Sequence, residues 1–135
     1  MTQPSFLTAS ALVAIGGGFG SWLRYLVGGL TSSLIGPARA TAFPWATLSV
    51  NVLGSFAMGL LVGWMARFGE GNQDLRLLIG VGLLGGFTTF SSFALEFVAL
   101  TQRGAIGSAL TYVALSLIAG FAGLFLGLML MRSAL

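Results

Sequence analysis

Long apolar stretches dominate the chain, and short segments rich in proline, glycine or charged residues separate them. Four stretches, residues 6–30, 44–66, 77–100 and 106–131, are made mainly of apolar residues. A helix that crosses about 30 Å of hydrocarbon needs about 20 such residues. The pattern therefore predicts an all-α membrane protein with four transmembrane helices in a single domain, residues 1–135. The apolar stretch nearest the N-terminus lacks a preceding basic segment, so we expect it to be retained as a span.

The composition narrows the classes of function. Of the 135 residues, 56% are hydrophobic and 7% are charged, whereas about 25% are charged in ordinary globular domains. The chain contains neither histidine nor cysteine, which removes imidazole and thiol chemistry, and we expect no enzyme. The six basic residues are arginines spread singly along the sequence, so no basic patch predicts nucleic-acid binding.

The arginines give no preferred orientation in the membrane. With four crossings, one side carries Arg39 and Arg103, plus Arg24 if its side chain reaches outward, and the other carries Arg67, Arg76 and Arg132. Positive charge near the ends of spans normally sets topology, so this balance permits insertion in both directions and an antiparallel homodimer. The alternative is one fixed orientation that a simple count does not reveal.

Glycines recur four residues apart in each span. The pairs are Gly16 and Gly20, Gly59 and Gly63, Gly82 and Gly86, and Gly123 and Gly127. This spacing lets helix backbones approach closely, which favours a tightly packed bundle or dimer. The alternative is that glycine is simply frequent in membrane helices.

The third span contains residues that favour a broken helix. Gly85 and Gly86 precede Thr88 and Thr89 in the middle of the apolar stretch, and adjacent glycines and β-branched residues lower helix propensity. A break at this depth frees backbone carbonyls, which must be buried or face a polar cavity and which suit a hard cation such as Na⁺. The alternative is an intact helix whose hydroxyls bond back to preceding carbonyls.

Polar and aromatic side chains follow helical spacing on three spans. The sets are Phe90, Phe93 and Phe97 in the third span, Thr47, Asn51 and Ser55 in the second, and Ser108, Tyr112 and Ser116 in the fourth. Ring edges carry positive potential, and hydroxyl and amide groups donate hydrogen bonds. A path lined in this way favours anions.

Three side chains within the spans have two interpretations each. Asn51 is either the main donor to an anion or one half of an interhelical hydrogen bond. Arg24 either extends to the membrane interface or lies in a vestibule, where its charge would attract anions. Glu96 is the only acid within a span, and it either accepts from Ser92 or pairs with an arginine.

Residues 85–93, GGFTTFSSF, resemble the Gly-Gly-x-Thr-Thr-Phe-Ser-Thr-Phe signature of the Fluc, or CrcB, family of small fluoride channels. Ser92 is the one departure, and it keeps the hydroxyl but lacks a methyl group. Residues 20–25 and 47–54 are similar to two further blocks of that family, in the same order along the chain. The resemblance covers essentially the whole sequence.

The resemblance implies a dual-topology homodimer with two antiparallel pores in the bacterial cytoplasmic membrane. Such a channel exports fluoride passively from the cytoplasm, and its expected partners are fluoride, a second copy of the chain and membrane lipid. A structural Na⁺ at the dimer interface would be held by the backbone carbonyls of Gly85 and Thr88 from both subunits.

The same resemblance assigns side chains to the fluoride path. Phe90 and Phe93 would be the pore phenylalanines, with the two rings of each pore coming from different subunits. Asn51 would donate to the ion, and Tyr112 and Ser116 would belong to a hydroxyl-lined track.

Two other functions fit a small four-helix membrane protein. A proton-coupled multidrug exporter needs a carboxylate in its binding chamber, whereas Glu96 comes late in the third span. A purely structural membrane subunit would use the glycine contacts alone, and the polar stripes argue against it.

Overall fold

The computed structural model describes residues 3–68 and 72–133, and it contains four helices long and apolar enough to cross a membrane. The first is α1, Phe6–Ile35, the second is α3, Trp45–Phe68, and the fourth is α7, Ile106–Ser133. The third covers Gln73–Gln102 and is built from several shorter pieces. Each predicted span coincides with one of these four helices, and the largest difference is that α1 continues to Ile35.

Glycine and proline shape the connection after α1 and the turn before α7. Gly36 ends α1 with a φ of 84°, and Pro37 then occupies the first turn of the short helix α2, Pro37–Ala42. Gly104 has a φ of 76° in the turn before α7. Positive φ costs glycine little, because it has no Cβ. Both connections are therefore tight.

The third span is broken, as predicted. Thr88 has a ψ of 158°, and Thr89 has a φ of −153° and a ψ of 120°, so both residues are extended. The break lies two residues beyond the paired glycines, which remain helical. The pieces are α4, Gln73–Leu75, the π-helix η1, Arg76–Leu84, α5, Gly85–Phe87, and after the break α6, Phe90–Gln102. The π-helical winding was not predicted.

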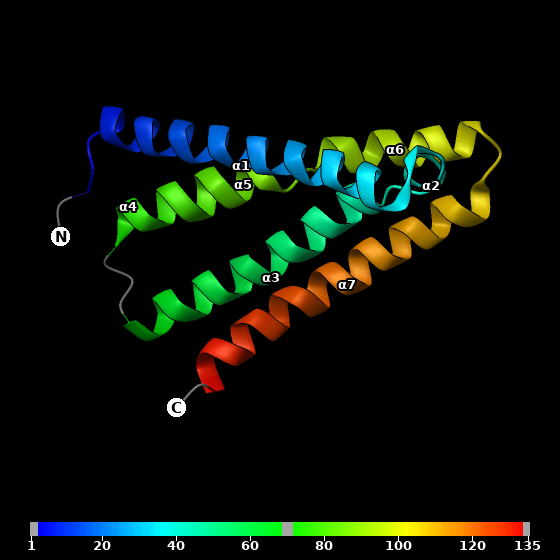
Figure 1. Ribbon diagram of the computed structural model, residues 1–135. Helices are drawn as coiled ribbons and strands as arrows, with labels where there is room; N and C mark the ends of the chain where they lie inside the picture. The colour runs from blue at the N-terminus through cyan, green and yellow to red at the C-terminus, as the bar shows by residue number, and fades with distance from the viewer. Residues whose placement is uncertain (1–2, 69–71, 134–135) are drawn as a thin grey trace.

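The helices pack mainly as two pairs (Figure 1). Helix α1 lies along η1 and α5, and α3 lies along α7, which also contacts α6. The start of α1 and the end of α7 lie at one end of the molecule, while α2 and the turn between α6 and α7 lie at the other. This arrangement agrees with four crossings.

The predicted glycine contacts occur within the chain. A Cβ on Gly82 would lie 3.0 Å from the Cα of Gly16, and one on Gly59 would collide with the carbonyl of Leu124. The remaining members of the four pairs also face a neighbouring helix within 4 Å. Glycine is therefore what permits α1 to approach the third span and α3 to approach α7.

The apolar core is small and lies near α2. Leu100, Ala109 and Tyr112 are buried there, with Phe43 and Phe97 among the side chains that pack against them. Many other large apolar side chains of the spans are exposed. Such a surface is expected where lipid, rather than water, surrounds the helices.

Candidate anion site

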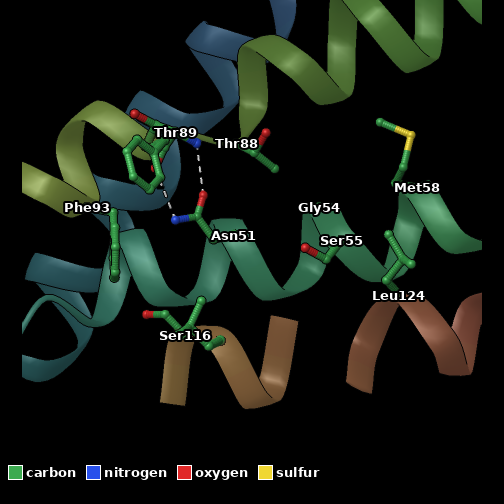
Figure 2. A pocket seen from close by; sticks show the side chains of 11 residues that line it. Asn51, Gly54, Ser55, Met58, Thr88, Thr89, Phe93, Ser116 and Leu124 are labelled. Atoms are coloured by element: carbon green, nitrogen blue, oxygen red, sulfur yellow. Dashed lines mark hydrogen bonds between the residues drawn. The ribbon is translucent and has the colours of Figure 1, made fainter. Parts of the chain in front are cut away.

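Asn51, in the second turn of α3, bonds to the backbone of the third span at its break. The carboxamide oxygen accepts from the Thr89 N–H at 2.8 Å, and the amide nitrogen donates to the Thr89 carbonyl at 3.1 Å (Figure 2). Thr89 is buried, so its backbone groups need partners within the protein. The interhelical hydrogen bond that was one of two interpretations of Asn51 is thus present.

This bonding leaves Asn51 with unused donor capacity. An amide NH₂ has two N–H groups, and Thr89 is the only hydrogen-bond partner of Asn51 among the described residues. One N–H therefore remains for a ligand. The structural and the ligand-binding interpretations of Asn51 are compatible.

The break also changes the partners of two backbone N–H groups. In a continuous helix these groups would donate to the carbonyls of Gly85 and Thr88. In an α-helix the donors to these carbonyls come four residues later, from Thr89 and Ser92. Here the Thr89 N–H bonds to Asn51, and the Ser92 N–H donates to the Thr89 Oγ1 at 3.2 Å. Two carbonyl oxygens in the middle of the span thus lose their helical donors. Oxygen ligands of this kind fit a hard cation such as Na⁺.

A cavity of about 330 Å³ lies beside the break. Its lining includes Asn51 from α3, Phe90 and Phe93 from α6, and Ser116 from α7. Figure 2 shows α3 running between the break on one side and Ser116 on the other. Four of the five residues predicted for an anion path therefore line one cavity.

The polar lining of this cavity favours an anion over a cation. None of the lining residues ionises, and the Ser116 Oγ is buried without a hydrogen-bond partner in the described part of the chain. Helix α6 begins at the cavity with Thr89 as its N-cap, and the positive end of a helix dipole favours negative charge. A buried hydroxyl without a partner and an unused amide N–H are donors available to a small anion.

The two phenylalanines of the cavity differ in exposure. Their ring centroids are 5.7 Å apart, and the ring planes are inclined by 41°. Phe90 is 80% exposed in the single chain, whereas Phe93 is partly buried and contacts the ring of Tyr112 at 5.1 Å. Phe90 therefore projects from the surface of one chain.

Tyr112, the fifth predicted path residue, lies beside the cavity and binds Glu96. Its hydroxyl donates to one carboxylate oxygen of Glu96 at 2.6 Å, and the Thr47 hydroxyl donates to the other at 2.7 Å. The two predicted interpretations of Glu96 are both wrong, because its partners are neither Ser92 nor an arginine. The Ser92 hydroxyl instead accepts from Thr89 at 3.1 Å.

Arg24 and Gly85 lie apart from this cavity. Arg24 is half-buried on α1 and is absent from the cavity lining, so its vestibule assignment stays a prediction. Gly85 is exposed and lines a separate cavity with Arg76 and Met58, whereas Thr88 belongs to the cavity beside the break.

The sequence did not predict the cluster of Thr47, Glu96 and Tyr112, although both hydroxyl donors belong to predicted polar stripes. Thr47 and Tyr112 were each recognised as members of polar stripes on α3 and α7, and Glu96 as the only acid within a span. A carboxylate in lipid needs donors, and those two stripes offered hydroxyls at matching depth. This requirement was the signal that could have connected the three residues.

Comparison with known proteins gives a consistent result over nearly the whole chain. A family model described as CrcB-like protein, Camphor Resistance (CrcB), matches residues 11–128. A protein of Novosphingobium aromaticivorans is 56% identical over 126 residues, which are 93% of this chain and 98% of that protein. One from Rhodospirillum centenum is 52% identical over 122 residues, or 90% and 94% of the two chains. Both relatives are named fluoride-specific ion channel FluC.

Proposed function

Because the chain belongs to the CrcB family, we propose that it is a fluoride-selective channel through which fluoride leaves the cytoplasm down its electrochemical gradient. It is a multi-pass membrane protein and not an enzyme. The names of its relatives support fluoride as the transported ion. The observation that carries the proposal is the Ser116 hydroxyl, which is buried without a hydrogen-bond partner among the described residues and lies in the cavity that Asn51 and the two phenylalanines line.

The mechanism follows from the donors in this cavity. Fluoride is small and strongly hydrated, so a selective path must replace water with closely spaced donors. The spare N–H of Asn51 and the Ser116 hydroxyl provide conventional hydrogen bonds, and the ring edges of Phe90 and Phe93 provide weaker positive potential. Tyr112 continues the path toward Glu96. Arg24 would raise the anion concentration in a vestibule.

A proton-coupled drug exporter fits the cavity poorly. Such a transporter exchanges protons for cations at a carboxylate in its binding chamber. Glu96 does not line the cavity beside the break, and its two carboxylate oxygens already accept from Tyr112 and Thr47. The chamber carboxylate that this function requires is therefore lacking among the described lining residues.

We propose that two copies of the chain form an antiparallel dimer with two pores. The balanced arginines permit both orientations, and Phe90 is largely exposed in one chain. An exposed ring next to a polar cavity is explained if a second copy covers it, so that each pore takes one ring from each subunit. The proposed location is the bacterial cytoplasmic membrane.

A structural Na⁺ at the dimer interface is part of this proposal. The carbonyls of Gly85 and Thr88 have lost their helical donors, and Gly85 is exposed. Two carbonyls from one chain fall short of the coordination that hard cations usually take, and the same pair from a second copy would double the number of oxygens. A bound Na⁺ would hold the two broken spans together by neutralising the negative ends of these carbonyl dipoles.

Ion efflux from liposomes tests the function. Purified protein is reconstituted in vesicles loaded with potassium fluoride or potassium chloride, and an ion electrode follows release after a K⁺ ionophore is added. We expect rapid release of fluoride and negligible release of chloride. Equal release of both anions, or release that requires a proton gradient, would reject the proposal.

Substitution of the cavity phenylalanines tests the path. Phe90→Ile and Phe93→Ile each remove a ring edge, so we expect a large loss of fluoride flux from dimers that still form. Phe125→Ile is the matched control, because Phe125 is exposed on α7 outside the cavity. Wild-type flux in both cavity variants would exclude an aromatic contribution.

Cysteine labelling tests orientation. The chain contains no cysteine, so Ser133→Cys at the end of α7 introduces a single thiol. Labelling from both sides of the membrane is expected for dual insertion. Labelling from one side only would rule out the antiparallel pair.

A further inference from the structure

A second, smaller cavity lies at the end of the molecule that contains α2 and the turn before α7. It has a volume of about 260 Å³, and its lining includes Thr41 from α2, Pro44, Glu96 from α6 and Arg103 from the turn. It contains one acidic and one basic side chain. Neither the fluoride path described above nor the family comparison assigns this cavity a function.

A chain of contacts joins this cavity to the one beside the break. Phe93 lines the first cavity, and its ring lies 5.1 Å from that of Tyr112. The Tyr112 hydroxyl donates to Glu96, which lines the second cavity. The group of Thr47, Glu96 and Tyr112 therefore stands between the two cavities, with its hydroxyl donors held in place by the carboxylate.

Arg103 is fixed in position at the second cavity. Its Nε donates to the Ala99 carbonyl at 3.2 Å, and its Nη1 donates to the Thr41 carbonyl at 3.0 Å. Both partners are neutral, and no carboxylate lies within ion-pair distance of Arg103 in the described chain, so the positive charge is not neutralised by direct pairing. A guanidinium has five N–H donors, which leaves some of them for other ligands.

An anion that passes the Glu96 group meets a negative charge. A fixed positive charge in the same cavity offsets this repulsion and raises the local concentration of anions. Arg103 meets that need, because it lines the cavity that Glu96 also lines and is restrained by two backbone carbonyls from different segments.

We propose that the cavity lined by Arg103 is a mouth of the fluoride path, and that Arg103 is the charge that concentrates fluoride there. The inference rests on the proposed channel function, to which it adds where the path opens and which residue attracts the ion there. The ligand is a small hard anion, which Arg103 would attract by its charge and bind by N–H donation.

Three variants separate charge from structure. Arg103→Gln removes the charge. Arg103→Lys keeps the charge but loses the guanidinium group that bonds to two backbone carbonyls. Arg39→Gln removes an arginine from α2 on the same side of the membrane, outside the cavity. Fluoride efflux is measured at subsaturating fluoride, in about 10 mM and about 1 M of the salt of a large organic anion.

At low salt we expect about threefold less flux from Arg103→Gln, the effect of one charge about 7 Å from the ion in water. Arg103→Lys should match the wild type, and Arg39→Gln, whose charge lies outside the cavity, should lose less flux than Arg103→Gln. At about 1 M salt the deficit of Arg103→Gln should vanish, because the Debye length falls from about 30 Å to about 3 Å. A deficit of equal size at both salt concentrations, or an equal deficit in Arg103→Lys, would show that Arg103 acts only as a structural clamp.

Arg103→Cys provides a test that does not depend on comparing separately folded variants. A cationic thiosulfonate reagent should restore the low-salt flux of this variant, and an anionic reagent should lower it further, since the chain has no other cysteine. Identical effects of both reagents would overturn the inference. Absence of selective fluoride flux from the wild type would instead reject the channel function itself, so the two failures are distinguishable.

Discussion

Replacing Asn51 separates its contribution to the broken helix from its contribution to the ion path. Asn51→Leu removes both bonds to Thr89, at 2.8 Å and 3.1 Å. Each bond contributes about 1 kcal/mol, and the buried Thr89 N–H left without a partner adds about 1 to 3 kcal/mol. We therefore expect Asn51→Leu to lose about 3 to 5 kcal/mol of the free energy of unfolding.

Asn51→Asp affects the two properties differently. The ionised carboxylate still accepts from the Thr89 N–H, but its second oxygen faces the Thr89 carbonyl oxygen instead of donating to it, so the expected loss of stability is more than about 1 kcal/mol. Its charge repels fluoride, and two like charges about 4 Å apart at an effective dielectric constant of about 20 repel by about 4 kcal/mol. Fluoride flux at pH 8 should therefore fall by more than tenfold.

The assays are chemical unfolding in detergent, followed by tryptophan fluorescence, and fluoride efflux from liposomes. Asn72→Asp is the matched control, because Asn72 caps α4 outside the long spans by accepting from the Leu75 N–H at 3.2 Å, and aspartate caps helices equally well. Wild-type flux in Asn51→Asp would refute Asn51 as a donor to the ion. Wild-type stability in Asn51→Leu would refute its bonding to the break.

Two further predictions concern packing and the Glu96 group. Gly127→Ala should destabilise the chain by at least about 1 to 3 kcal/mol, since a Cβ there would collide with the Phe56 carbonyl and lie 2.7 Å from the Leu60 nitrogen. Gly107→Ala is the control, because a Cβ on Gly107 meets nothing within 4 Å. In the same unfolding assay this control should stay within about 1 kcal/mol of the wild type. Equal tolerance of both would contradict the close packing of α3 and α7. A double-mutant cycle of Tyr112→Phe and Glu96→Gln should give a coupling energy of about 1 kcal/mol or more, because the bond between them is 2.6 Å long. Additive losses would show that this bond contributes little.

Apolar length predicted the spans, and glycine spacing predicted where helices approach closely. Both patterns can be read from local sequence. A stretch of about 20 apolar residues is long enough to cross the membrane whatever its neighbours are. The collision predicted for a Cβ at Gly59 or Gly127 likewise follows from the small-residue spacing that close helix pairs require. These features needed no knowledge of how the helices are rotated.

The partners of Glu96 could not be predicted in this way. Thr47 and Tyr112 lie 49 and 16 residues away from it in sequence, so the contact depends on the relative rotation and depth of three helices. Local reasoning instead suggested Ser92, one turn earlier on the same helix. That hydroxyl bonds to Thr89, because Thr89 caps the helix that begins at the break.

The break explains both why the spacing of Phe90 and Phe93 was informative and why their directions were not. Helix α6 starts anew at Phe90, so its rotation is set by the Thr89 cap and by the bonds from Asn51 rather than by steps of about 100° continued from Gly85. Within α6 the three-residue interval holds, and both rings line one cavity. Which ring points outward depends on the two extended residues before them, and no periodicity runs through such residues. The exposed position of Phe90 therefore emerges only with the three-dimensional structure, and the antiparallel dimer that we propose would cover it.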